Sequence, residues 1–311
     1  MRRGLLGALA ICVAAALWGL DGVVLTPRLH ALDVLFVVFL LHAVPFLLMQ
    51  PFLAGSYPAL ARLGPRDWAV LLLVSLAGGI LGTFSIVKAL FLVDFQQLSV
   101  VVLLQKLQPV FAITLAAAML RERISARFIW RATLALVGAY LLTFGLRLPE
   151  AAAGDQGLAA AGWALLAAAS FGSATVLGKR LLGALDFRRA TFGRYGLTSA
   201  ISLLLLLVTG RGLPLAEVSP VHWALILVIG LTTGSGAIFL YYYGLTRVRA
   251  VVSAICELCL PLSAVVFDYW LNRSVLGGWQ WLGAILLVTA ITLVSLGSGR
   301  RPNVDESGPG D

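Results

Sequence analysis

Residues 96–119 read QQLSVVVLLQKLQPVFAITLAAAM, an apolar run interrupted by a single charge at Lys106. A helix needs about 20 residues to cross the hydrocarbon core of a bilayer, and this run is long enough to do so. A lysine in hydrocarbon costs free energy unless it meets a partner or a water-filled cavity. The stretch therefore predicts a membrane-spanning helix with one polar group near the bilayer midplane.

Similar runs make up most of the chain. Of its 311 residues, 60% are hydrophobic and 12% are charged, and the mean hydropathy is +0.97. A soluble domain has about 45–50% apolar and about 25% charged residues, which excludes soluble enzymes, nucleic-acid binders and disordered proteins. The runs are also longer than the roughly 10-residue strands of a membrane barrel, and they do not alternate. We predict ten spanning helices, at residues 5–26, 34–53, 68–87, 96–119, 128–147, 158–178, 192–209, 220–244, 250–271 and 279–297.

The positions of the basic residues indicate how these helices are oriented. The net charge is +9, and with a cytoplasmic N-terminus 17 Lys and Arg fall on the inner side, 5 on the outer side and Lys106 between them. Cytoplasmic loops are enriched in Lys and Arg, and a missed helix would erase this bias. The sequence thus predicts a multi-pass protein of the cell (inner or plasma) membrane with both termini cytoplasmic, and no nucleic-acid partner.

The two halves of the chain are similar at a spacing near 152 residues. Ala16-Leu17-Trp18-Gly19 aligns with Ala169-Ser170-Phe171-Gly172, and Pro109 aligns with Pro261. Each half holds five predicted helices, and an odd number makes the second half enter the membrane from the opposite side. We predict an all-α membrane protein of ten transmembrane helices in two inverted five-helix repeats, an architecture that secondary transporters use.

Three motifs make the chain resemble the drug/metabolite transporter superfamily, in particular the EamA family. They are Leu17-Trp18-Gly19 in the first helix, Leu107-Gln108-Pro109-Val110-Phe111 in the fourth and Arg121-Glu122-Arg123-Ile124-Ser125 at its end. The resemblance covers about residues 4–297 and implies a substrate cavity between two four-helix bundles, with the fifth and tenth helices packing peripherally. The second copy departs from the first, because it has Asn272-Arg273-Ser274 and no glutamate matching Glu122.

This organisation predicts two EamA-like five-helix repeats, at residues 4–148 and 157–298. Residues 299–311 are polar and rich in Gly and Pro, which is typical of a disordered tail, here a cytoplasmic one. The basic N-terminus followed by an apolar run is similar to a signal peptide. Because the run continues to Pro27 without a clear cleavage site, we interpret it as an uncleaved first helix.

Two prolines predict kinks in the fourth and ninth helices. Pro109 and Pro261 cannot donate a hydrogen bond to the carbonyl four residues back, so the carbonyls of Gln105 and Glu257 are expected to be free. Both carbonyls lie near the helix midpoints, where broken helices build transporter sites.

The candidate substrate-binding residues lie at the same depth. Lys106 and Glu257 are ionisable groups inside spanning helices, and Gln105 and Gln108 accompany them. Such groups indicate a functional site unless they neutralise each other. The alternative is therefore a structural Lys106–Glu257 ion pair that merely tolerates burial.

The ninth helix carries one small and polar face. Ser253, Glu257, Pro261, Ala264 and Asp268 follow the spacing i, i+4, i+8, i+11 and i+15. A face of this kind lines a water-filled cavity or a tight helix contact. We place Glu257 at the base of the cavity and Asp268 nearer its outer mouth.

Aromatic residues supply further candidates. Trp18 and Asp21 share a face of the first helix and predict an aromatic and acidic corner near the outer mouth, or else an interfacial pair that meets lipid headgroups. Tyr241, Tyr242 and Tyr243 point in three directions, and an interfacial belt is the favoured interpretation. Tyr241 is retained as a candidate for the cavity wall.

Other polar groups are assigned to structure. Arg194 and Tyr195 are interpreted as interface anchors, with lining of the inner gate as the alternative. His42 is interpreted as a hydrogen-bonded packing residue, with a ligand role as the alternative. Cys256-x-x-Cys259 has no second cysteine pair or histidine beside it, so it is assigned to packing. No nucleotide-binding loop, metalloprotease motif or catalytic triad pattern occurs. We therefore predict no enzyme, no cofactor and no metal site.

Together these features predict a secondary active transporter for a small polar or zwitterionic metabolite, such as an amino acid, working by alternating access in the lipid bilayer. Lys106 would bind a carboxylate and Glu257 an ammonium group, with Gln105 and Gln108 orienting the solute. Glu257 carrying a coupling proton is an alternative role, and a homodimer stays open. The runner-up is an exporter of organic cations or drugs, and the distant alternative is a membrane scaffold.

Overall fold

The computed structural model describes residues 2–29, 31–93, 98–148, 154–273 and 275–297. Ten helical spans in these ranges are long and apolar enough to cross a membrane, and each predicted run overlaps one of them. The predicted tail, 299–311, lies outside the described residues. In chain order the elements are α1 (Arg2–Leu20), η1 (Asp21–Leu25), η2 (Thr26–Leu29), α2 (Val34–Leu53), η3 (Ala54–Ser56), α3 (Tyr57–Ala61), α4 (Pro65–Val74), η4 (Ser75–Leu81), α5 (Gly82–Leu92), α6 (Leu98–Gln105), α7 (Gln108–Met119), α8 (Ala126–Phe144), α9 (Gly154–Leu181), α10 (Phe187–Val208), η5 (Leu215–Glu217), α11 (Pro220–Ile229), η6 (Gly230–Gly234), α12 (Ser235–Leu245), α13 (Ala250–Cys256), α14 (Cys259–Asn272) and α15 (Gly278–Gly297).

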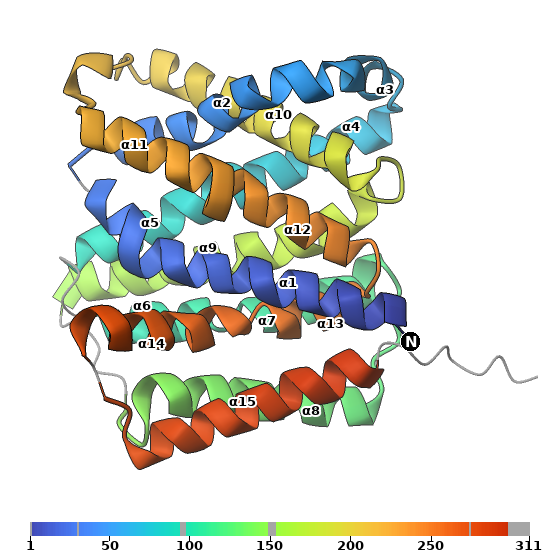
Figure 1. Ribbon diagram of the computed structural model, residues 1–311, viewed down its shortest axis with the longest axis vertical. Helices are drawn as coiled ribbons and strands as arrows, with labels where there is room; N and C mark the ends of the chain where they lie inside the picture. The colour runs from blue at the N-terminus through green and yellow to red at the C-terminus, as the bar shows by residue number, and fades with distance from the viewer. Residues whose placement is uncertain (1, 30, 94–97, 149–153, 274, 298–311) are drawn as a thin grey trace, which may run out of the picture.

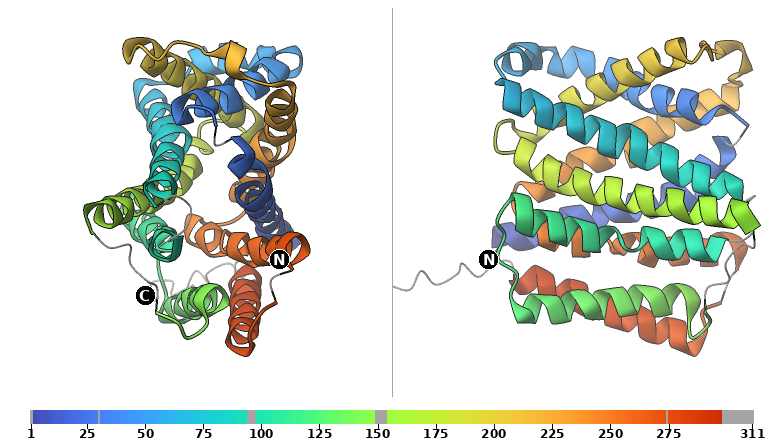
Figure 2. Two further views of the ribbon diagram at one scale, coloured as in Figure 1. Left: turned by 90° about the vertical axis from the view of Figure 1, so that its left-hand side faces the viewer. Right: turned by 180° about the vertical axis from the view of Figure 1, so that it is seen from behind.

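The spans lie side by side and share one general direction (Figure 1). The fifth and tenth spans, α8 and α15, pack mainly against each other at one edge of the molecule. The other eight surround a common centre when the molecule is viewed nearly end-on (Figure 2, left). This arrangement agrees with the peripheral fifth and tenth helices that the resemblance implies.

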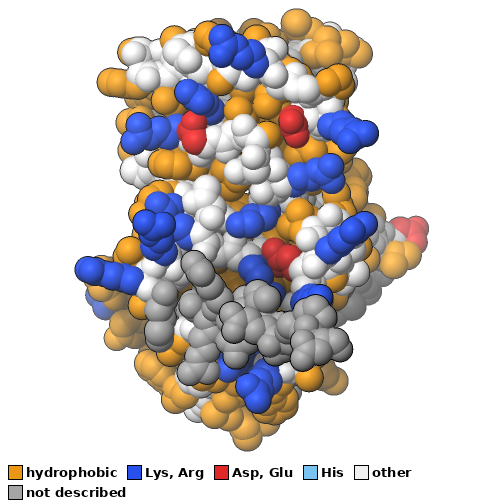
Figure 3. Space-filling model, turned by 90° about the vertical axis from the view of Figure 1, so that its right-hand side faces the viewer, with side chains coloured by type: hydrophobic (Ala, Val, Ile, Leu, Met, Phe, Trp, Pro, Cys, Tyr) orange, Lys and Arg blue, Asp and Glu red, His pale blue; other side chains and the backbone are white. Residues whose placement is uncertain are grey.

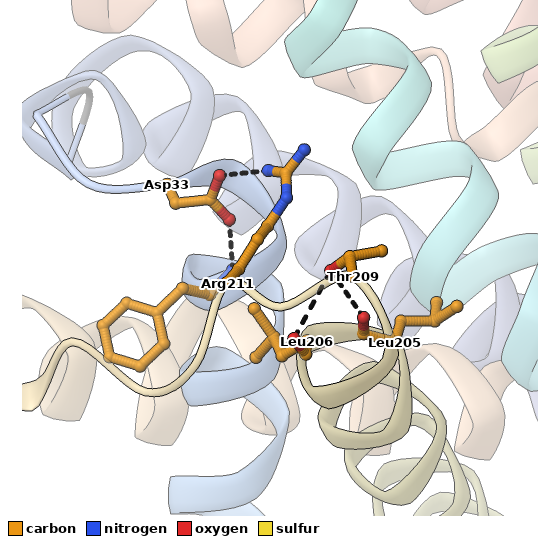
Figure 4. Close-up of polar contacts among 6 residues, drawn as sticks. Asp33, Leu205, Leu206, Thr209 and Arg211 are labelled. Atoms are coloured by element: carbon orange, nitrogen blue, oxygen red, sulfur yellow. Dashed lines mark hydrogen bonds and ion pairs between the residues drawn. The ribbon is translucent and has the colours of Figure 1, made fainter.

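Matching aspartates fix where the second and seventh spans begin. Asp33 accepts a hydrogen bond from the Phe36 backbone N–H at 3.1 Å, and Asp186 accepts from the N–H groups two and three residues on, at 3.0 and 3.1 Å. Such caps satisfy backbone donors that a helix start leaves unpaired. Asp33 also pairs with Arg211, which follows α10 (Figure 4). The seventh span was predicted to begin at 192, but the Asp186 cap makes it begin at Phe187.

Among the described residues, two spans contain a π-helical segment, η4 in the third and η6 in the eighth. A further π segment, η1, directly follows the first span. The third and eighth spans occupy equivalent places in the two repeats, so the local irregularity is repeated as well. A π segment shifts the rotational phase of the helix, and it therefore changes which side chains face the centre beyond it.

The fourth and ninth spans each break near the middle, as the prolines predict. A turn at Lys106–Leu107 separates α6 from α7, and a turn at Glu257–Leu258 separates α13 from α14. Pro109 and Pro261 follow these turns. The lysine and the glutamate are thus the first residues of two equivalent turns, one in each repeat.

The expectation of a free carbonyl at Glu257 is wrong. The Leu260 backbone N–H donates to this carbonyl at 3.0 Å, so a three-residue turn replaces the hydrogen bond that the proline cannot make. The same expectation at Gln105 stays a prediction.

Two glycines bring each repeat against the broken helix of the other. A Cβ built on Gly19 of α1 would lie 2.8 Å from the Leu260 carbonyl oxygen of α14. A Cβ on Gly172 of α9 would lie 2.8 Å from the Gln108 carbonyl oxygen of α7. The glycines that align in sequence therefore make equivalent contacts, and their lack of a side chain permits close helix approach.

Gly283→Val is expected to separate α15 from α8 and to lower thermal stability. A Cβ on Gly283 would lie 2.2 Å from the Leu142 backbone nitrogen and 2.8 Å from the Gly138 carbonyl oxygen. Overpacking costs roughly 1–3 kcal/mol, so the midpoint of thermal unfolding in detergent should fall by roughly 5 °C or more. Gly162→Val is the matched control, because a Cβ there meets nothing within 4 Å. Equal effects of both substitutions would contradict the close α8–α15 contact.

Candidate functional site

The centre of the candidate site is the buried carboxylate of Glu257, which is 8% exposed. Gln108 Nε2 donates to its Oε2 at 2.6 Å. Its Oε1 accepts hydrogen bonds from the hydroxyls of Tyr241 at 2.9 Å, Ser253 at 3.1 Å and Thr175 at 3.2 Å. We call these five residues the Glu257 cluster. A buried carboxylate is stable only with such partners, and here all of them are neutral donors.

The cluster joins both repeats. Gln108 comes from the fourth span, Thr175 from the sixth, Tyr241 from the eighth, and Ser253 and Glu257 from the ninth. The Tyr241 hydroxyl also lies 2.9 Å from Thr175 Oγ1 and 3.4 Å from Ser253 Oγ. Because hydroxyl groups can donate and accept, the cluster can rearrange its hydrogen bonds around a polar ligand.

An aromatic wall lies beside this cluster. The Trp18 and Tyr241 ring centroids are 5.3 Å apart at an interplanar angle of 51°, and Tyr242 is 5.9 Å from Tyr241. Tyr241 is 3% exposed and Tyr242 is fully buried, so the belt interpretation is wrong for both. Tyr243 lies further out, with Arg247 Cζ 3.4 Å from its ring centroid. The direction in which each tyrosine side chain points depends on the π segment η6, which precedes the three tyrosines in the same span.

A small cavity of about 50 Å³ lies between the two helix breaks. Lys106 and Glu257 both line it, yet they do not form an ion pair within the described part of the chain, so the structural ion pair is not what the structure contains. A volume of this size holds water molecules, whereas metabolite pockets measure about 300–1,000 Å³. The lining residues are Gln105, Lys106, Gln108, Pro109, Glu257, Leu258, Leu260 and Pro261.

Asp21 is not brought into the Glu257 cluster. Asp21 begins the π segment η1, and its Oδ1 atom is buried without a hydrogen-bond partner among the residues that the structure describes. Asp268 lies in α14, and its side chain falls outside what is described. Asp21 therefore stays a candidate for the outer part of a cavity, separate from Glu257.

Two predictions about polar residues outside the Glu257 cluster have different outcomes. His42 Nδ1 lies 2.8 Å from the Val38 carbonyl oxygen and its ring 4.9 Å from that of Tyr195, which confirms the hydrogen-bonded packing role. Arg194 was predicted to be an interface anchor, and this is wrong because the side chain is only 7% exposed. The earlier start of α10 moves Arg194 from the helix end into the bundle.

Thr175 is the functional candidate that sequence reasoning missed. It lies 82 residues from Glu257 in the chain, and its own helix shows no polar stripe that would single it out. The available signal was its position one turn after Phe171 in the repeated motif. Within the described ranges, no three His, Cys, Asp or Glu side chains are placed to hold a metal ion.

The chain is similar to a family model, to a curated relative and to solved structures. A family model described as the EamA-like transporter family matches residues 5–144 and again residues 158–296. The riboflavin transporter ImpX of Fusobacterium nucleatum subsp. nucleatum is 47% identical over 291 residues, which cover 93% of this chain and 97% of that protein. A crystal structure aligns with a TM-score of 0.74 at 17% identity, covering 94% of this chain and 97% of the other, and this likeness concerns the fold alone.

Proposed function

Because the chain belongs to the EamA-like transporter family and is therefore a multi-pass membrane transporter for a small molecule, we propose that its substrate is riboflavin or a closely related flavin. The observation that carries the substrate is the 47% identity, over nearly the full length of both chains, with a protein named as a riboflavin transporter. The site chemistry supports the same substrate. This proposal replaces the amino acid as the favoured solute.

Riboflavin joins a planar tricyclic ring to a chain of hydroxyl groups, and the site offers partners for both parts. Trp18 and Tyr241 form an aromatic wall on which a planar ring can stack. The Glu257 carboxylate, with Thr175 and Ser253 beside it, can accept and donate hydrogen bonds to hydroxyl groups. Riboflavin carries no ammonium group, so Glu257 acts here as a strong hydrogen-bond acceptor.

We propose that transport proceeds by alternating access of the repeats at residues 4–148 and 157–298. The cavity between the helix breaks, about 50 Å³, is too small for a flavin, so binding requires the helices around it to separate. The equivalent turns, π segments and glycine contacts of the two repeats support two states of similar energy.

We further propose that both termini are cytoplasmic and that the protein lies in the cell membrane. Lys and Arg side chains gather on the end of the molecule where α1 begins (Figure 3), and cytoplasmic ends are the basic ones. The distribution of 17 inner against 5 outer basic residues supports the same orientation. Arg194 is one of the 17, but its side chain is buried and does not lie at the surface.

A second candidate substrate class is the zwitterionic metabolite. It is favoured by Lys106 and Glu257, which line one cavity without forming an ion pair with each other in the described residues. Lys106 would bind the carboxylate and Glu257 the ammonium group. Export of organic cations would use Glu257 and the aromatic wall, but Lys106 beside them opposes a cation.

A thermal-shift panel tests the proposal on purified protein. Riboflavin is expected to raise the unfolding midpoint at micromolar concentration, because a ligand that binds only the folded protein stabilises it. Zwitterionic amino acids and quaternary amines are the comparison groups. Selective stabilisation by either group would replace riboflavin with that substrate class, and a flat response to all three would contradict the proposed transport of such solutes.

The same panel, run on the Lys106→Gln variant, distinguishes a flavin substrate from a zwitterionic one. A flavin offers no carboxylate, so riboflavin affinity is expected to stay within about threefold of the wild-type value, whereas losing a charged hydrogen bond to a zwitterion costs about tenfold or more. A tenfold loss of riboflavin affinity in Lys106→Gln would show that the lysine contacts the flavin directly.

A further inference from the structure

Arg194 is a buried cation that the proposed site does not use. It lies in α10, inside the membrane span that begins at Phe187, and it is 7% exposed. A guanidinium stays charged in proteins, so at this depth it requires a partner or a functional reason.

Its protein partners leave the charge uncompensated. Arg194 Nη1 donates to the Tyr242 hydroxyl at 3.2 Å, and its Cζ lies 5.8 Å from the Tyr242 ring centroid. Its Nε is buried and has no hydrogen-bond partner among the described residues, and no carboxylate there forms an ion pair with it. Gly78 of the third span makes room for the group, since a Cβ at this position would lie 2.6 Å from Nη2.

Arg194 is connected to the Glu257 cluster through the two buried tyrosines. Tyr242 contacts Arg194, Tyr241 contacts Glu257, and the two rings lie 5.9 Å apart. The cation and the carboxylate therefore flank one aromatic pair. This arrangement suits a ligand with hydrogen-bond acceptors at one end, a flat ring in the middle and hydroxyl groups at the other end.

We propose that Arg194 is a substrate-binding and specificity residue that donates to the acceptor edge of a flavin ring. The proposal rests on the proposed function. The pyrimidine ring of the flavin carries a carbonyl oxygen next to an acceptor nitrogen, and this neighbouring pair of acceptors matches the planar donor fork of a guanidinium. In this arrangement the ring lies along the aromatic wall, and the ribityl hydroxyls reach the Glu257 cluster.

The test compares riboflavin with lumiflavin, which keeps the tricyclic ring and has a methyl group in place of the ribityl chain. Binding to purified protein is followed by quenching of flavin fluorescence. In Arg194→Gln both affinities are expected to fall by about 10- to 100-fold, the range for a lost charged hydrogen bond. Unchanged affinities would overturn the proposal, and a loss confined to riboflavin would move Arg194 to the ribityl chain and overturn the ring-edge assignment.

Three further variants separate binding from folding. Arg188→Gln removes an exposed arginine from the same helix and should leave both affinities within about twofold of wild type. Tyr242→Phe keeps the aromatic ring and removes only the hydroxyl that accepts from Arg194, so it is expected to lower both affinities by less than Arg194→Gln does. A loss as large as in Arg194→Gln would mean that the arginine acts only through Tyr242, and it would overturn the proposal. If Arg194→Gln does not fold, Arg194→Lys keeps the charge without the planar fork, and wild-type affinity in that variant would overturn the proposal.

Failure of this inference is distinguishable from failure of the proposed function. Wild-type protein that binds neither flavin removes the flavin substrate and this inference with it. Wild-type protein that binds riboflavin, together with an Arg194→Gln variant that binds it equally well, removes the inference alone.

Discussion

Glu257→Gln is expected to lower riboflavin uptake into reconstituted vesicles at least about tenfold while the protein still folds. Glutamine has the same shape, and the Gln108 amide can turn over to present its oxygen, so the hydrogen bonds of the cluster can all be kept. Only the negative charge is lost, and a charged acceptor contributes about 1.5–3 kcal/mol to a hydrogen bond with a ligand. Uptake at the wild-type rate would exclude Glu257 from the transport site.

The same variant distinguishes substrate binding from proton coupling. If Glu257 binds the flavin, both exchange of riboflavin between equal pools and gradient-driven accumulation should fall together. If it carries a coupling proton, exchange should persist while accumulation driven by a proton gradient is lost. Glu217→Gln is the matched control, because Glu217 is exposed in the short helix η5 and should show neither effect.

Gly19→Val and Gly172→Val are each expected to abolish most transport and to lower thermal stability by roughly 5–10 °C. Both changes push a side chain against the backbone of a broken helix, at Leu260 and Gln108 respectively, where only the helices themselves can move. Forcing these helices apart would displace the turns that hold Lys106 and Glu257. The measurements are the unfolding midpoint and the initial rate of riboflavin uptake.

The control Gly162 lies in the same span as Gly172, and the control Gly22 lies in the π segment that directly follows the span of Gly19. Gly22→Val and Gly162→Val add the same side chain where a Cβ meets nothing within 4 Å, and they should stay within about 2 °C of wild type. If Gly172→Val keeps wild-type stability and transport while Gly19→Val loses them, the two repeats do not make equivalent contacts. Tolerance at both would contradict the cross-repeat packing altogether.

Elements governed by local sequence were predictable. Apolar runs located all ten spans, because a helix must satisfy its backbone within itself in lipid. Pro109 and Pro261 located the two breaks, since a proline removes a particular backbone donor. Lys106, Gln108 and Glu257 came together because equivalent turns of an inverted repeat meet at the centre.

Features that depend on contacts between spans were not predictable in the same way. Thr175 joins Glu257 only because the sixth and ninth spans approach each other, and no periodicity within the sixth span marks it. Tyr241 faces the cluster because η6 shifts the phase of its helix. A regular helical projection cannot reproduce that shift.

Arg194 was misplaced for a different reason. The hydrophobic run suggested a helix start at 192, whereas Asp186 caps the helix and makes it begin at Phe187. An aspartate before a helix is a recognisable start signal, so this boundary could have been read from the sequence. What the sequence could not supply is the Tyr242 partner, which is 48 residues away.

The contact made by Gly19 also bears on how the protein is built during synthesis. Gly19 belongs to the first span inserted into the membrane, while its neighbour Leu260 belongs to the ninth. The first helix therefore resides in the bilayer without this neighbour until most of the chain has been translated. Since packing in membranes follows insertion, substitutions on this face of α1 are exposed to quality control before they can affect transport. Their damage should depend on the speed of synthesis as well as on the free energy of the finished fold.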